Sequence, residues 1–145
     1  MLIASGSASC ASRPSEDSGQ HGGSGITAGT DSLPAITVRR TGGLAGVDDQ
    51  LVVDTDGAWV TTDKAGGRRT GHLTAANVAA VRALATDPHL ATEADRPTTA
   101  TRCQDAFDYA VTIGAVRIRY TDCPTDAARP RATIALVSRL RQATA

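Results

Sequence analysis

The chain is poor in aromatic residues, with one Trp, two Tyr and one Phe among 145 residues. Proteins that bind single-stranded nucleic acid stack bases on several aromatic side chains, so this composition disfavours that class. The charge balance disfavours it too, because 15 Lys and Arg residues match 15 Asp and Glu residues and leave no net field to attract a polyanion. Nucleic acid is therefore not an expected partner.

The sequence also lacks an apolar run of the ~20 residues that a membrane-spanning helix needs. Its 145 residues, 41% of them hydrophobic, are enough for one domain with a modest core. We therefore expect a single small domain, in monomeric form, with any membrane contact made only through an N-terminal lipid anchor.

Groupings of reactive residues typical of enzymes are missing as well. His21, His72 and His89 are scattered, and no G-x-S-x-G, phosphate-binding glycine motif or CxxC is present. The stretch Asp54–Gly57 begins like a calcium-binding loop, but its glycine comes too early and no glutamate closes the loop. We expect neither an enzyme nor a protein that needs a metal or another cofactor.

The N-terminal region is small, polar and glycine-rich. Residues 1–9 resemble the end of a truncated secretory signal, and Cys10 follows them where the lipobox of bacterial lipoproteins places its lipidated cysteine, although Ser7 stands where an aliphatic residue is usual. Residues 10–34 then read as a disordered Ser/Gly-rich tether. An incidental cysteine in a disordered tail is the alternative interpretation. The first reading predicts an extracytoplasmic protein, lipid-anchored to the cell membrane or secreted.

Residues 35–145 contain two kinds of apolar periodicity. Alternating apolar and polar residues, separated by turns such as Asp56-Gly57 and Gly114, predict β-strands. The expected strands are 36–40, 51–54, 58–62, 68–72, 107–113 and 115–120.

Apolar residues at helical spacing predict two helices. The first begins at the N-cap Thr74 and ends before Asp87-Pro88, with 88–102 expected to be a loop. The second begins near Pro130 and carries Ile134, Val137 and Leu140 on one face. The predicted fold class is α+β: a small antiparallel sheet, made of a meander plus a C-terminal hairpin, with two amphipathic helices packed on one face.

Cys103 and Cys123 flank the expected hairpin that turns at Gly114. Folding the hairpin brings the two residues together at its open end, which predicts a disulfide in an exported protein. Two free buried thiols are the alternative for a cytosolic protein.

Four features together resemble emfourin-like proteins, which are small bacterial inhibitors of thermolysin-like zinc metallopeptidases such as protealysin. These features are the strand 36–40 leading into Thr41-Gly42-Gly43-Leu44-Ala45-Gly46, the Trp59 hairpin, the helix start at Leu73-Thr74, and the hairpin 107–120. The resemblance covers residues 35–141 and implies an α+β inhibitor domain.

The resemblance also implies a partner-binding loop. Thermolysin-like enzymes favour a bulky aliphatic residue just past the scissile bond, so Leu44 would enter that pocket while its flanking glycines let the backbones approach. Asp48 or Asp49 would lie near the metal or a basic rim. The expected partner-binding residues are Gly42, Gly43, Leu44, Ala45, Gly46, Asp48 and Asp49.

Two alternatives stay open from the sequence. Leu44 can instead cover the sheet edge, with the glycines forming a bulge. The protein can also be a cell-envelope lipoprotein that acts as an interaction module without a protease target.

Overall fold

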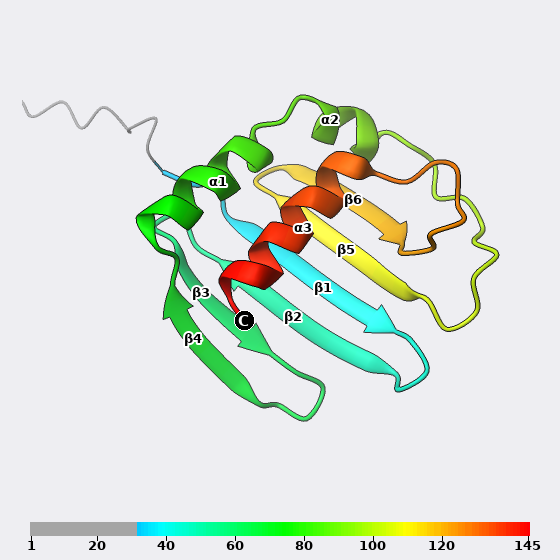
Figure 1. The fold of residues 1–145 in the computed structure, drawn as a ribbon, viewed down its shortest axis with the longest axis horizontal. Helices are drawn as coiled ribbons and strands as arrows, with labels where there is room; N and C mark the ends of the chain where they lie inside the picture. The colour runs from blue at the N-terminus through cyan, green and yellow to red at the C-terminus, as the bar shows by residue number, and fades with distance from the viewer. Residues whose placement is uncertain (1–31) are drawn as a thin grey trace, which may run out of the picture.

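The computed structural model describes residues 32–145, which form a six-stranded antiparallel sheet and three helices (Figure 1). The strands are β1 (Ile36–Gly42), β2 (Val47–Val53), β3 (Ala58–Thr62), β4 (Arg68–His72), β5 (Phe107–Ile113) and β6 (Val116–Thr121). The helices are α1 (Ala75–Ala85), α2 (His89–Ala94) and α3 (Arg131–Ala143). The predicted α+β class is confirmed.

Strand β1 is one of the two central strands of the sheet, whose order is β4-β3-β2-β1-β5-β6. The first four strands form the predicted meander, and the β5–β6 hairpin joins it by pairing β5 with β1. Ile36 lies opposite both Val53 of β2 and Ile113 of β5, and all three side chains are buried. Residues directly opposite each other in neighbouring strands point to the same face of the sheet, so these three side chains lie on one face, and that face forms one side of the core.

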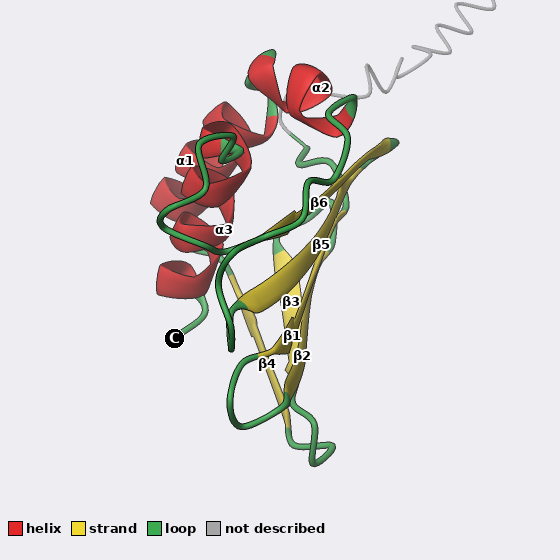
Figure 2. Ribbon diagram, turned by 90° about the vertical axis from the view of Figure 1, so that its right-hand side faces the viewer, coloured by secondary structure: helices red, strands yellow, loops and turns green. Residues whose placement is uncertain are grey.

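Helices α1, α2 and α3 all lie on that face, as Figure 2 shows, and the opposite face carries no helix of the described residues. Val81 of α1 and Leu136 and Leu140 of α3 are fully buried against the sheet. The Thr74 hydroxyl caps α1 by accepting a hydrogen bond from the Asn77 amide at 3.2 Å. The predicted packing on one face and the predicted N-cap are both confirmed.

The prediction that 88–102 is a loop is wrong in its first part, where α2 forms. The Asp87 carboxylate accepts a hydrogen bond from the His89 amide at 2.9 Å and so fixes the first turn. Leu90 then packs into the core with an exposed fraction of 3%. The Asp87-Pro88 pair thus ends α1 and also starts the next helix, because proline is tolerated at a helix start.

The ordered domain includes Leu33, two residues before the predicted domain start. Its side chain is 2% exposed, and its amide donates a hydrogen bond to the Thr55 carbonyl at 3.0 Å. Residues 1–31, with the predicted signal remnant, Cys10 and most of the predicted tether, lie outside the described residues.

The predicted disulfide is present between Cys103 and Cys123, whose Cα atoms are 5.7 Å apart. It joins the segment before β5 to the segment after β6, at the open end of their hairpin. No helix within 32–145 has both the length and the apolar character required to cross a membrane.

Candidate functional site

The glycine-rich loop is a tight hairpin turn between β1 and β2. Strand β1 ends at Gly42 and β2 begins at Val47, so only residues 43–46 project beyond the ladder, and we call these four residues the β1–β2 tip. The Gly46 amide closes the turn by donating to the Gly43 carbonyl at 3.0 Å. The predicted strand 51–54 is wrong at its start, because β2 begins at Val47, so Asp48 and Asp49 belong to the strand rather than to the loop.

Leu44 stands at the β1–β2 tip with 89% of its surface exposed. It is the one large hydrophobic residue that is exposed in the range 32–145. This exposure excludes the alternative in which Leu44 covers the sheet edge. Because the side chain is exposed, a partner could bury it, and full burial of a leucine stabilises a contact by about 1.5–3 kcal/mol.

The base of the tip is held against β5 by two glycines. Gly43 has a φ of 68° and its amide donates to the Ala106 carbonyl at 3.0 Å. A Cβ atom at Gly43 would lie 2.5 Å from a ring carbon of Phe107, and one at Gly42 would lie 2.9 Å from the Ala106 carbonyl oxygen. Only glycine permits this approach, which fixes the direction in which the tip leaves the sheet.

Arg40 supports the tip from the helix-covered face. Its guanidinium lies 4.7 Å from the centre of the Phe107 ring and forms an ion pair with Asp49, directly opposite in the β1–β2 ladder. Phe107 therefore contacts both a glycine of the tip and a cation behind it. This cluster makes the base of the tip a packed unit.

Arg39 and Asp48 form the matching pair on the open face. The Asp48 carboxylate accepts two hydrogen bonds from Arg39, at 2.9 Å from Nε and 2.8 Å from Nη2. These hydrogen bonds, followed by the charges of Arg39 and Lys64, lower the pKa of Asp48 from its ordinary value. Asp48 and Asp49 thus both bind arginines of their own domain.

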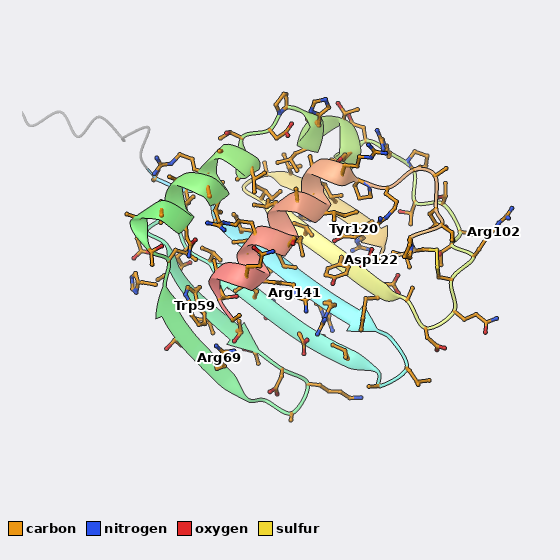
Figure 3. All side chains as sticks on the ribbon, in the orientation of Figure 1. Trp59, Arg69, Arg102, Tyr120, Asp122 and Arg141 are labelled. Atoms are coloured by element: carbon orange, nitrogen blue, oxygen red, sulfur yellow. A yellow bond between two sulfur atoms is a disulfide. The ribbon has the colours of Figure 1, made fainter. Side chains whose placement is uncertain are left out.

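A second surface feature is a groove of about 550 Å³ beside the C-terminal end of α3. Its walls include Arg69 and Arg141, which Figure 3 shows near Trp59 and on the last turns of α3. Arg69 donates to the Thr144 carbonyl at 3.3 Å and lies 6.0 Å from the Trp59 ring, while Arg141 donates to the Tyr109 hydroxyl at 3.3 Å. These contacts explain the arginines as attachments of the helix end to the sheet.

The histidines of the described region are in separate places. His72 lies 3.9 Å from Asp56, and His89 lies 2.8 Å from Asp87. Within 32–145, the structure contains no group of three or more His, Cys, Asp or Glu side chains that could hold a metal ion.

No protein-family model and no curated protein sequence matches the chain. Function is therefore inferred from the chemistry of the β1–β2 tip and its neighbours.

Proposed function

We propose that the protein is a binding protein that inserts Leu44 into an apolar pocket of its partner, and that the partner is a thermolysin-like zinc metallopeptidase. The observation that carries this proposal is the 89% exposure of Leu44 on a turn whose other residues are Gly43, Ala45 and Gly46. Small neighbours leave the leucine as the only bulky group at the tip. A pocket that accepts one aliphatic side chain can therefore close around it.

The supports of the tip favour binding. The Gly43–Ala106 hydrogen bond, the Phe107 ring and the Arg40–Asp49 pair hold the base in place before any partner arrives. Preorganisation of this kind lowers the entropy that association must overcome. Leu44 in the pocket would exclude the substrate side chain that normally occupies it, so inhibition would be competitive.

The proposed location is outside the cytoplasm, either secreted or held by a lipid on Cys10. The Cys103–Cys123 disulfide supports it, because such bonds persist in oxidising compartments and are rare in the cytosol. Intact-mass measurement of protein from a native host would reveal the lipid.

The direct test adds increasing amounts of the protein to thermolysin and follows cleavage of a peptide substrate. We expect inhibition by the unaltered chain and at least a roughly 30-fold weaker effect for Leu44→Asp, which forfeits about 2 kcal/mol of leucine burial. Ala76→Asp is the matched control: it adds the same charge on an exposed position in the first turn of α1, where a carboxylate is favourable.

Unchanged cleavage at a large excess of the unaltered chain would overturn the inhibitor proposal for this class of enzyme. Recovery of a non-peptidase partner from cell envelopes, lost in Leu44→Asp, would instead favour an interaction module.

A further inference from the structure

The β1–β2 tip has a close neighbour at the same end of the sheet, the β3–β4 turn formed by Asp63–Gly67. Figure 1 shows the two turns side by side beyond the ends of their strands. The Asp63 carboxylate fixes the second turn by accepting hydrogen bonds from the amides of Ala65 at 2.9 Å and Gly67 at 2.8 Å. Both turns are therefore defined structures that can meet one partner together.

Lys64 links the two turns. A Cβ atom built on Gly46 would lie 3.3 Å from the Lys64 ammonium nitrogen, so the cation sits against the β1–β2 tip two residues from Leu44. It is also the only lysine in the sequence. The tip thus carries one exposed apolar side chain with one ammonium group next to its backbone.

The ammonium group has no ion-pair partner in the part of the chain that the structure describes. The acidic residue that it influences is Asp48, and both oxygens of that carboxylate already accept hydrogen bonds from Arg39. Lys64 is therefore placed to pair with an anion that the domain itself does not supply.

We propose that Lys64 is a second partner-binding residue, so that the contact surface of the two turns fits an apolar pocket bordered by a carboxylate. The inference rests on the proposed function of Leu44, since it names the chemistry beside the pocket that Leu44 enters. An ammonium group beside an apolar anchor helps to orient the two proteins and speeds their association. A charge at the edge of an interface attracts its partner over about one Debye length, which shortens as the salt concentration rises.

The test compares Lys64→Gln with Lys64→Arg in inhibition of thermolysin at low and high salt. Removal of the charge should weaken inhibition by about 3–10-fold at low salt, with the difference shrinking at high salt as the interaction is screened. Lys64→Arg should stay within twofold of the unaltered chain. Arg117→Gln, which removes an exposed cation from β6 at the other edge of the sheet, is the charge-matched control and should change nothing.

A second readout uses the uniqueness of the lysine. A carbodiimide condenses an amine and a touching carboxylate into an amide and takes up the water as a urea, so the complex should yield a cross-linked peptide that joins Lys64 to an acidic residue of the peptidase. Lys64→Arg should inhibit but give no such peptide.

The outcomes separate the two proposals. If Leu44→Asp loses inhibition while Lys64→Gln inhibits normally and the unaltered chain gives no cross-link at Lys64, the Lys64 inference fails and the function of Leu44 stands. If the unaltered chain does not inhibit thermolysin, both fail. Thermal melting by circular dichroism should give the same midpoint for the Lys64 variants and the unaltered chain, since the side chain is exposed.

Discussion

The carboxylate of Glu93 in α2 caps the start of α3 at Thr133. One oxygen accepts hydrogen bonds from the Thr133 amide at 2.9 Å and the Thr133 hydroxyl at 2.6 Å, and the other accepts one from the Ala132 amide at 2.9 Å. Pro130, the N-cap of α3, supplies no side-chain hydrogen bond of its own. A residue about 40 positions earlier thus satisfies two of the free amides of this helix and complements its dipole.

Glu93→Gln should therefore lower the free energy of unfolding by about 2 kcal/mol, because hydrogen bonds to a charged group are lost and an NH₂ group faces an amide donor. Urea unfolding followed by circular dichroism measures the change. Asp95→Asn, which neutralises an exposed carboxylate just after the same helix, is the control and should cost less than about 0.5 kcal/mol. Equal effects of the two substitutions would rule out the cap.

The disulfide should contribute about 3 kcal/mol on the chain-entropy model, since it closes a loop between residues 20 apart. We expect the Cys103→Ser/Cys123→Ser double variant to have a free energy of unfolding lower by that amount than the protein with both cysteines, each in a Cys10→Ser background and measured by urea unfolding. Mass spectrometry without reductant should give the protein with both cysteines a mass that is two hydrogens lower than that of its reduced form. Free thiols at both positions in protein from an oxidising compartment would contradict the pairing.

Gly43→Ala and Gly66→Ala form a matched pair of substitutions. Both glycines have positive φ, 68° and 84°, so alanine costs about 1 kcal/mol at either position. At Gly66 nothing lies within 4 Å of the added carbon, whereas at Gly43 the Phe107 ring lies 2.5 Å away. Overpacking should make Gly43→Ala more destabilising by a further ~1–3 kcal/mol. If chemical denaturation gives equal values for the two, the Phe107 ring does not hold the tip.

Alkaline pH should destabilise the fold through Tyr120. Burial of this side chain, with smaller contributions from Tyr109 and Asp122, raises its pKa above the ordinary value. The unfolded chain releases this proton near pH 10 and the folded chain does not, so stability falls as pH rises above about 10. Absorbance at 295 nm should show tyrosine ionisation delayed well beyond that pH in the folded protein.

The matched variant for this titration is Tyr120→Phe, which keeps the ring that stacks on Tyr109 at a centroid distance of 4.9 Å. It should remove the delayed step and reduce the dependence of stability on alkaline pH. A delayed step that persists in Tyr120→Phe would assign it to another group.

The sheet could be predicted because the signals for its strands are local. Apolar and polar residues alternate around Ile36 and Val38 and around Val111 and Ile113, and turn glycines follow within a few residues. Helix α2 could not be predicted, since it has only six residues and follows a proline. What stabilises it lies far away in sequence, in the packing of Leu90 and in the bonds that Glu93 makes with α3. Periodicity carries no information about contacts of that range.

The candidate site was predictable in part. The sequence pointed to Leu44 but left its direction open, because a glycine-flanked leucine fits a turn that projects and one that folds back. Arg39-Arg40 and Asp48-Asp49 flank the turn, with Arg40 directly opposite Asp49 and Arg39 reaching Asp48 diagonally. Two arginines facing two aspartates across a short glycine-rich turn were the missed sign that β2 begins at Val47. The position of Lys64 beside Gly46 depends on how two hairpins neighbour each other in the sheet, which no local pattern encodes.

The burial of Leu33 gives the domain a polarity. Its amide is bonded at the β2–β3 turn, and the seven residues of β1 then run, at about 3.4 Å each, to the opposite end of the sheet where Leu44 emerges. The N-terminal side of the chain therefore enters the domain at the end of the sheet that is opposite Leu44. If the protein is attached through its N-terminal side, Leu44 therefore lies at the end of the sheet away from the attachment, roughly 24 Å from the start of β1.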